Sequence, residues 1–369
     1  MRIPLNRNLP TPIYQQVYQF QRDQIESGVL GPETRLPSTR QLAKDLNISR
    51  ITVQNAYLDL EAEGLIFTKE GSGSFVRVPL KALTEEKATK DMDWPGWQRQ
   101  FESASQPEPW GTFPPHPDLI SFTGVGASEE FPIRHFMKAL KTVSNYNGEK
   151  AFKYGRLDGG FFPLRERITE ILASQGIRAR AEHILITAGS QQALSLISQV
   201  LLKPGDAVIV ENPTYNLALD LFRNMGIEMI GIPVDEKGMQ VDGLKDMIVK
   251  HKPKLIYTIP NFQNPAGVSL SNERRRKLLA LVDEYNIPLI EDDFVGDLRF
   301  EGRALPAIKA LDPGGRVLYI GTFSKMLMPG LRMGYVVGDG LIYSKLVNTY
   351  VVSNLTTSPL IQRALHEFM

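Results

Sequence analysis

The sequence predicts a two-domain protein, in which a small α+β domain precedes a larger α/β domain with a mainly parallel sheet. The 369 residues exceed the length of one ordinary domain. Three helical patterns and a hairpin fill residues 12–78, whereas short apolar runs alternate with helical stretches from about residue 118. Residues 79–117 are rich in Pro, Trp, Glu and Lys without a sustained period, which predicts a linker. We therefore expect domains at residues 1–78 and 118–369.

The composition is typical of a globular protein, with 42% apolar and 22% charged residues. The net charge is only +1, so a nucleic-acid partner would have to be recognised by a local basic patch. The absence of cysteine excludes disulfides, thiolate metal ligands and a thiol nucleophile. The first thirty residues show no secretory signal, and no run is long enough to span a bilayer. We expect a cytoplasmic protein.

The first domain shows start and stop signals for three helices in order. Ser38 opens the second helix in a Ser-x-x-Gln pattern that is typical of a capping box, and Ser49 caps the third. Residues with a tendency to break helices follow each one: Gly28, Asn47 and Gly64. Residues 65–68 and 74–78 then predict two strands around a short glycine-rich wing.

Basic residues gather where the second and third helices begin. Residues 35–50 carry three arginines and Lys44 against Asp45, a local charge of +3, and the acidic residues come at the far end of the third helix. Helix N-termini donate N–H groups to phosphates, and arginines read base edges or hold phosphates. A single arginine could be solvated surface, but the ordered set favours DNA binding. The expected DNA contacts are Arg35, Ser38, Arg40, Arg50, Thr52, Gly71 and Gly73.

The second domain contains short apolar runs that predict buried strands. They cover residues 183–187, 207–210, 229–233, 254–259, 288–291, 317–321 and 334–337. Helical stretches, among them residues 191–202 and 273–285, lie between several of these runs. This alternation predicts a three-layer α/β domain, with a mainly parallel sheet covered by helices.

The strongest chemical motif is residues 321–335. Lys325 follows two small hydroxyl residues at the end of a predicted strand, and an arginine comes seven residues later. This arrangement resembles fold type I enzymes that use pyridoxal 5'-phosphate (PLP). PLP needs a lysine amine for a Schiff base, and hydroxyl and guanidinium groups for its phosphate. The resemblance implies that Lys325 forms the Schiff base and that Thr322, Ser324 and Arg332 bind the phosphate.

Three further segments resemble the same enzymes, in the same order along the chain. The N–H groups of Ser190 and Gln191 open a helix after a glycine turn and would cradle the phosphate. Tyr215 would stack on the pyridine ring, although an ordinary core tyrosine is as good an explanation without this context. Asn264 would bind the phenolic oxygen of PLP, and a turn-forming asparagine is the alternative.

Three acidic residues, at positions 291–293, follow another predicted strand. A carboxylate is costly there unless it is paired, and the resemblance implies that Asp292 pairs with the protonated pyridine nitrogen. A metal site is the other interpretation, but no histidine lies nearby. The chain departs from its relatives at Phe294 and Val295, where regulators or aminotransferases carry a tyrosine. Neither residue can donate a hydrogen bond to the cofactor oxygen, which favours cofactor binding over tuned catalysis.

Two more glycine-rich segments complete the resemblance. Residues 154–160 are similar to the stretch that crosses the dimer interface of these enzymes, which implies a homodimer in which Tyr154 reaches the phosphate of the neighbouring subunit. Residues 122–126 resemble a substrate-side glycine stretch and lack the third glycine and the helix of a dinucleotide fingerprint.

Residues 12–78 resemble the GntR-type winged helix-turn-helix, above all at positions 35–43, 49–53 and 71–76. Joined to an aminotransferase-like domain, it gives the layout of the MocR/GabR family of bacterial transcription regulators. The resemblance implies that the protein binds operator DNA and senses an amino compound or PLP through an aldimine at Lys325. An active aminotransferase with a DNA-binding appendage is the alternative, and a repressor that uses the second domain only to dimerise is a third. Family members continue into a small C-terminal domain, so we expect either a truncated or partial chain or a protein that lacks half of its effector pocket.

Overall fold

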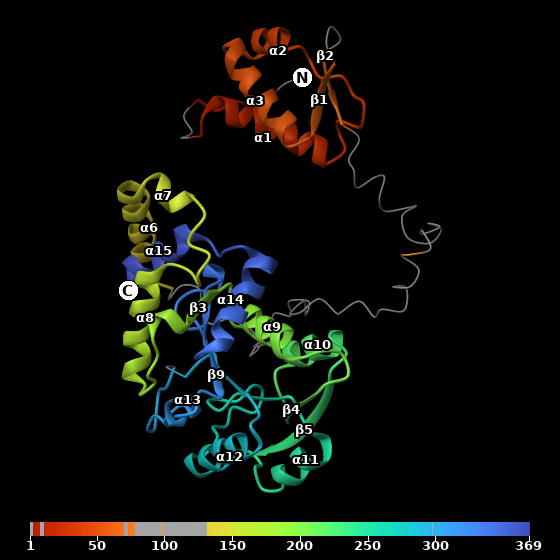
Figure 1. The fold of residues 1–369 in the computed structure, drawn as a ribbon. Coiled ribbons are helices and arrows are strands. Elements are labelled where there is room, and N and C mark those ends of the chain that lie inside the picture. The colour runs from red at the N-terminus through yellow and green to blue at the C-terminus, as the bar shows by residue number, and fades with distance from the viewer. Residues whose placement is uncertain (1–2, 8–10, 70–72, 78–96, 98–130, 297) are drawn as a thin grey trace. The chain divides into compact units, whose positions relative to one another are not determined.

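The computed structural model describes residues 3–7, 11–69, 73–77, 97, 131–296 and 298–369. It divides into two compact units, Met1–Thr112 and Phe113–Met369 (Figure 1). Each unit has hydrophobic clusters of its own. No helix in the described part of the chain is long and apolar enough to cross a membrane.

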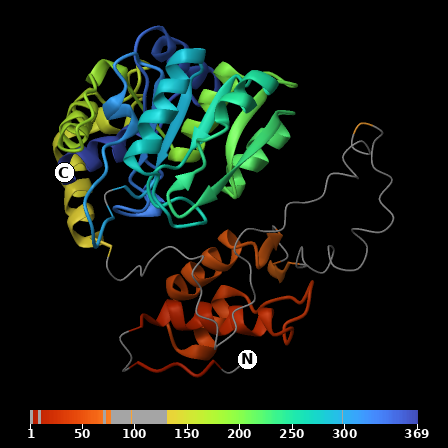
Figure 2. The same ribbon diagram turned by 90° about the horizontal axis from the view of Figure 1, so that it is seen from below.

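The first unit contains three helices and a hairpin, which Figure 2 shows in red and orange. Its elements are α1 (Ile13–Glu26), α2 (Thr39–Leu46), α3 (Arg50–Ala62), β1 (Ile66–Lys69) and β2 (Gly73–Val76). The strands pair antiparallel. Val17 of α1, Leu42 of α2 and Val53 of α3 are fully buried in one cluster. Burial of these apolar residues stabilises a unit that is too small for a second layer.

The predicted helix ends are confirmed, with one correction. The Oγ atoms of Ser38 and Ser49 each accept a hydrogen bond, at 3.1 Å, from the third residue of the following helix. Asn47 and Gly64 adopt left-handed backbone conformations directly after α2 and near the end of α3. The reciprocal half of the expected capping box is wrong. The Gln41 side-chain amide instead donates to Asp45 at 2.7 Å, a hydrogen bond to a charged carboxylate one turn further along α2.

The second unit is built on one eight-stranded sheet, in the order β3-β10-β9-β8-β7-β4-β5-β6. The strands are β3 (Ile184–Thr187), β4 (Ala207–Asn212), β5 (Glu228–Asp235), β6 (Gly238–Met239), β7 (Leu255–Thr258), β8 (Leu289–Asp293), β9 (Val317–Thr322) and β10 (Gly334–Val337). Only β10 and β6 run antiparallel to their neighbours, so the prediction of a mainly parallel sheet is confirmed. The two-residue strand β6 was not predicted, since it is too short to show an alternating pattern.

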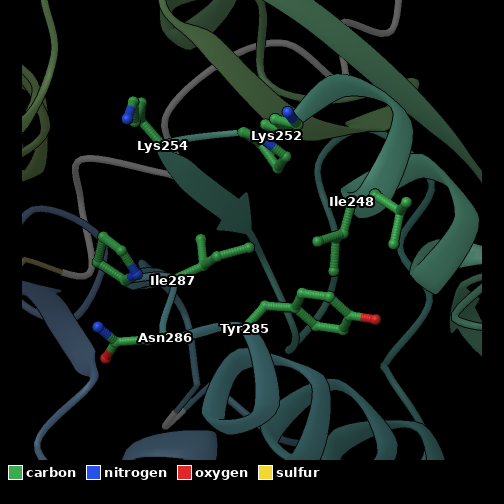
Figure 3. Close-up of a pocket in the computed structure, with 9 residues that line it drawn as sticks. Ile248, Lys252, Lys254, Tyr285, Asn286 and Ile287 are labelled. Carbon is green, nitrogen blue, oxygen red and sulfur yellow. The ribbon is translucent and has the colours of Figure 1, made fainter.

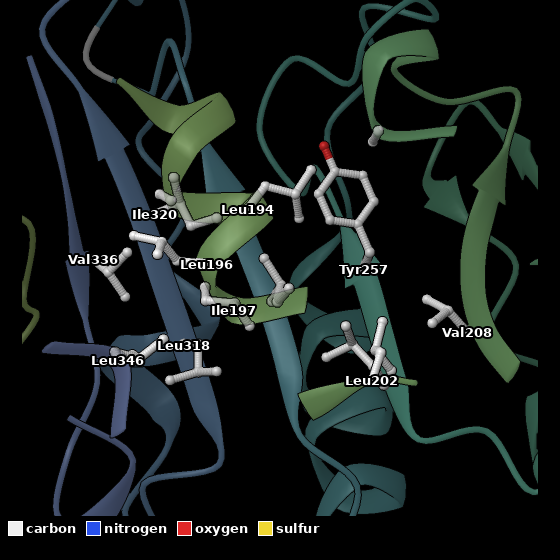
Figure 4. Packing of buried hydrophobic residues seen from close by; sticks show 14 of the residues in the cluster. Leu194, Leu196, Ile197, Leu202, Val208, Tyr257, Leu318, Ile320, Val336 and Leu346 are labelled. Atoms are coloured by element: carbon white, nitrogen blue, oxygen red, sulfur yellow. The ribbon is translucent and has the colours of Figure 1, made fainter. Parts of the chain in front are cut away.

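Helices cover both faces of this sheet (Figure 1). They are α6 (Ile133–Asn147), α7 (Glu149–Phe152), α8 (Phe162–Ser174), η2 (Ala181–His183), α9 (Ser190–Leu201), α10 (Asn216–Asn224), α11 (Leu244–His251), α12 (Asn272–Tyr285), α13 (Ile308–Leu311), η3 (Pro329–Leu331), α14 (Leu341–Asn354) and α15 (Pro359–Phe368). Leu194 and Ile197 of α9 pack against Ile320 of β9 on one face (Figure 4). Alternate strand residues pack against α11, α12 and α8 on the other face. With both faces covered, the central strands are apolar throughout.

Candidate cofactor site and DNA-binding surface

The cofactor residues predicted from sequence come from loops at one edge of the sheet. Strands β4, β7, β8 and β9 are parallel and adjacent, so their carboxyl ends meet at that edge. Tyr215, Asn264, Asp292 and Lys325 lie at these ends or just beyond them. Strand β3 runs in the same direction, because β10 is antiparallel to both β3 and β9, and it brings Ser190 to this edge.

The loop after β9 and the turn after β3 contact each other directly. The Nη2 atom of Arg332 donates to the carbonyl oxygen of Ala188 at 2.9 Å. Gly189 has a φ of +104°, and a Cβ atom built there would lie 2.8 Å from that same Nη2. The turn therefore requires glycine, both for its backbone and for the close approach of the guanidinium. Arg332 is thereby held beside the first turn of α9, where N–H groups have no partner within the helix.

The hydroxyl groups of Thr322 and Ser324, which lie close to Lys325 in the sequence, contact each other. Thr322 Oγ1 lies 3.1 Å from Ser324 Oγ and accepts a hydrogen bond of 3.2 Å from the Ser324 backbone N–H. Lys325 is exposed in the turn that follows, and within the described residues it has no ion pair. A lysine amine, two hydroxyl groups and a guanidinium therefore come from this loop.

Among the described residues, one oxygen of the Asp292 side chain accepts a hydrogen bond and the other does not. The Tyr257 hydroxyl donates to Oδ2 at 2.9 Å, whereas no described donor reaches the buried Oδ1. Burial raises the pKa of Asp292 to about 7; the Tyr257 hydrogen bond lowers it, and the charge of Asp293 raises it. A buried carboxylate oxygen needs a partner. The protonated nitrogen of a pyridine ring would supply one, so this residue fits PLP.

Tyr215 lies within the electrostatic reach of the same groups. Burial raises the pKa of its phenol most, the charge of Asp292 raises it further, and Arg332 lowers it. Asn264 is partly buried in the loop after β7. At the start of α9, the Gln191 side chain donates to the Leu217 carbonyl at 3.1 Å, and its backbone N–H belongs to the first turn of the helix. The structure thus gathers the candidate residues of this unit, apart from Tyr154, at one edge of the sheet.

Three residues of this site were missed by the sequence reasoning, namely Tyr257, Glu211 and Gln263. The first two stand in otherwise apolar strands, and each has a polar group that is fully buried. A buried hydroxyl or carboxylate must find a partner, so their positions were a usable signal. Gln263 gave no such signal, because it lies in a loop whose folded path cannot be inferred from its composition.

Other residues that the sequence analysis singled out lie away from this edge or outside the described residues. Tyr154 is 80% exposed, just after α7. Phe294 is partly buried and packs against the core on the α9 face. Residues 122–126 lie outside the described residues. No group of three His, Asp or Glu side chains in the described part of the chain could hold a metal ion.

A separate cleft of about 530 Å³ lies at the opposite edge of the sheet (Figure 3). Ile248, Lys252, Lys254, Tyr285 and Ile287 are among its lining residues. They come from the ends of α11 and α12 and the starts of β7 and β8. The cleft is therefore distinct from the cofactor edge.

The residues expected to contact DNA belong to the first unit. Arg40 and Arg50 are exposed, near the N-termini of α2 and α3, and no ion pair engages either of them within the described residues. Arg35 pairs with Phe75 through a β-bridge, and its side chain lies over Gly73 of the wing. Arg40 and Arg50 of the helices, and Arg35, which is bridged to the hairpin, thus belong to one unit.

The remaining predicted DNA contacts are placed less clearly. Thr52 Oγ1 lies 2.7 Å from Ser49 Oγ, so both hydroxyl groups take part in the cap of α3. Ser38 is exposed and caps α2. Gly71 lies outside the described residues.

These features define a class of protein, a winged helix-turn-helix joined to a fold type I domain that binds PLP. Residues 13–76 match the family of bacterial regulatory proteins of the gntR type, and residues 124–366 match aminotransferase class I and II. The chain is 33% identical over 99% of its length to the probable rhizopine catabolism regulatory protein MocR of Rhizobium meliloti, 73% of which it covers. It is 32% identical over 97% of its length to the HTH-type transcriptional regulator YdfD of Bacillus subtilis, and covers 74% of it. The chain belongs to the MocR-type family of GntR transcription regulators.

Solved aminotransferases share the fold of the second unit. Kynurenine aminotransferase of Pyrococcus horikoshii is 42% identical with a TM-score of 0.61, and the match covers 64% of this chain and 59% of the enzyme. LysN of Thermus thermophilus, an α-aminoadipate aminotransferase, is 35% identical with a TM-score of 0.63, over 66% of this chain and 62% of the enzyme. The chain thus spans about three-fifths of these enzymes. Both enzymes were solved with PLP-derived groups, and PLP is the cofactor of this fold.

Proposed function

We propose that this protein regulates transcription by binding DNA through the first unit and sensing an amino compound, or PLP itself, at Lys325. One observation carries the proposal. A single chain joins an exposed, basic winged helix to a buried Asp292 carboxylate that has an oxygen available for a cofactor. Membership of a family of regulators supports the same assignment. Because the partner is chromosomal DNA, we expect the protein to act in the cytoplasm.

The residues at the cofactor edge divide the work of binding. PLP, when bound, supplies an aldehyde that reacts with primary amines and a ring that withdraws electrons. Arg332, Thr322 and Ser324 would hold the phosphate, and Asp292 would hold the proton of the ring nitrogen. Lys325 supplies an amine with which an amino effector competes. An effector that binds one conformation better shifts DNA affinity, and DNA shifts effector affinity by the same factor.

Transamination is the second candidate function. The chain is 41% identical to aromatic-amino-acid aminotransferase 1 of Thermococcus litoralis, over 62% of this chain and 56% of that enzyme. Against this candidate, Phe294 and Val295 offer no hydroxyl group to the cofactor. A measurement of catalytic turnover distinguishes transamination from regulation. An enzyme forms keto product in excess of the protein, whereas a regulator binds the amino compound without repeated conversion.

The sensing proposal can be tested with DNA chosen by the protein itself. Fragments selected from a random duplex pool would be titrated by fluorescence anisotropy without PLP, with PLP, and with PLP plus each of a panel of amino acids. We expect at least one addition to change DNA affinity about tenfold in the parent and not in Lys325→Ala. Equal affinities throughout, for both proteins, would leave the second unit without a sensing role.

The DNA-binding surface has a separate test on the same fragments. We expect Arg50→Ala to weaken binding about tenfold and to reduce the salt dependence by about one counterion. Arg180→Ala, an exposed arginine of the second unit, is the control. Equal binding by both variants would remove α3 from the interface.

We propose in addition that two chains form a homodimer. Phe152 and Tyr154 expose 69% and 80% of their surface, and Tyr154 begins the segment that resembles the dimer-crossing stretch of the related enzymes. A second copy would cover them. Light scattering on the purified protein tests this, since the double variant Phe152→Ser, Tyr154→Ser should show a larger monomer fraction than the parent.

A further inference from the structure

One buried side chain connects the two loops that carry Tyr215 and Asn264. Gln263, 2% exposed, donates through Nε2 to the Pro213 carbonyl at 2.8 Å. Its Oε1 atom accepts from the Ala266 N–H at 2.9 Å. Pro213 lies two residues before Tyr215, and Gln263 directly precedes Asn264. The amide thus fixes the end of one loop to the interior of the other.

Glu211 fixes that amide in turn. Its Oε2 atom accepts a second hydrogen bond from Gln263 Nε2, at 3.0 Å. The carboxylate is 2% exposed at the end of β4, and it also accepts from Thr258 Oγ1 at 2.6 Å and from the Ile259 N–H at 3.2 Å. These donors belong to β7 and the residue after it, so Glu211 is anchored across two neighbouring strands. Only an amide nitrogen pointed at Glu211 satisfies both acceptors.

We propose that Gln263 is a positioning residue, which Glu211 locks in place, and that it sets the spacing between the Tyr215 ring and the Asn264 amide at the cofactor edge. The two loops leave the paired strands β4 and β7, and beyond those strand ends the described hydrogen bond between them runs through Gln263, so its loss would let their separation vary. Cofactor binding requires both residues at once, and a change of about 1 Å in a supporting residue weakens such a site. The inference rests on PLP binding at this edge and is independent of DNA binding and effector sensing.

The test measures the affinity of the full chain for PLP by titration of its absorbance. Gln263→Met keeps the volume and removes all three hydrogen bonds, and we expect PLP affinity to fall about tenfold. The matched control is Glu291→Gln. Glu291 is also fully buried and accepts two backbone N–H groups, from Ile308 at 2.9 Å and Lys309 at 2.7 Å, but it serves neither loop. Equal affinity losses in variant and control would overturn the proposal.

A second variant separates positioning from a general effect on folding. In Gln263→Glu the new side chain can still accept from Ala266, and once protonated its single O–H can donate to Glu211, although not to Pro213 as well. The titratable groups that face Glu211 are Asp292 on β8 and Tyr257 on β7. We expect the affinity deficit relative to the parent, about tenfold near pH 8, to shrink to about threefold near pH 6. A deficit that does not change with pH would contradict the role of the amide donor.

If Gln263→Met does not fold, Gln263→Glu still tests whether Gln263 positions the two loops. Hydrogen exchange of the cofactor-free proteins gives a readout that does not depend on PLP. We expect Gln263→Glu at high pH to lose protection at the backbone amides of residues 214–216, because its carboxylate cannot donate to Pro213 or Glu211, and to keep protection at Ala266, from which it still accepts. Unchanged protection at residues 214–216 would mean that the loops are not coupled. Failure of the parent to bind PLP would overturn the cofactor assignment itself, and with it this proposal.

Discussion

Replacement of Asp292 by Asn should stabilise the cofactor-free protein and weaken its hold on PLP. Burial raises the pKa of Asp292 from its ordinary 3.8 to about 7. Below about pH 4 the carboxyl is protonated in both the folded and unfolded states. As the pH rises to 7, the unfolded state releases its proton first, so folding becomes less favourable. Above pH 7 the folded state contains a buried charge, and the accumulated loss is about 4 kcal/mol.

Asn keeps an acceptor for the Tyr257 hydroxyl and carries no charge. The cofactor-free variant should therefore melt about 8 °C above the parent near pH 8, and at nearly the same temperature near pH 4. Excess PLP should narrow this difference by about half, because a thirtyfold loss of affinity corresponds to about 2 kcal/mol. The parent gains an ionic hydrogen bond to the ring nitrogen, so the variant should bind PLP about thirtyfold more weakly.

Thermal melts followed by circular dichroism, with and without PLP, at both pH values, measure these effects. Asp246→Asn is the control, because that residue is exposed on α11. A cofactor-free Asp292→Asn protein that melts below the parent near pH 8 would refute the reasoning. Its amide would then be costlier in this site than a buried carboxylate, and desolvation would not dominate at Asp292.

Three further predictions concern single contacts. Tyr257→Phe removes the hydrogen bond that lowers the pKa of Asp292, so the pH profile of PLP affinity should shift upward; an unchanged profile would contradict this role. Gly189→Ala should weaken PLP binding more than Gly205→Ala, because both have positive φ but only the first would bring a Cβ atom to within 2.8 Å of Arg332; equal losses would mean that backbone strain alone matters. Ser49→Ala should destabilise the first unit by about 1 kcal/mol, measured as an earlier thermal transition, since it removes the cap of α3; an unchanged transition would show the cap to be dispensable.

Local signals were sufficient for the first unit. Capping serines and helix-breaking residues identify where a helix begins and ends whatever surrounds it, and the bounds of α2 and α3 follow from them. The exception was the side chain of Gln41. This side chain could accept from the Ser38 backbone N–H or donate to the Asp45 carboxylate, and a motif does not resolve which partner it takes.

The sequence also singled out the candidate cofactor residues in the second unit, because each stands in a short motif next to a predicted strand. Lys325, Arg332 and Asp292 were chosen in this way, and the sheet order then brings their loops to one edge. The role of Asp292 in PLP binding stays a prediction, as does that of each other site residue. The order of the strands itself could not be read from the chain, since it depends on which apolar faces pack together.

Tertiary structure alone decided the groups that support the site. Tyr257 donates to Asp292 from the neighbouring strand, and Gln263 joins loops whose partners are 50 residues apart in sequence. Such contacts form between positions that share no local pattern, because hydrogen-bond partners are selected by the fold after the apolar faces are buried. The sequence thus determined which chemical groups the protein possesses, and the packing of the sheet decided which of them meet.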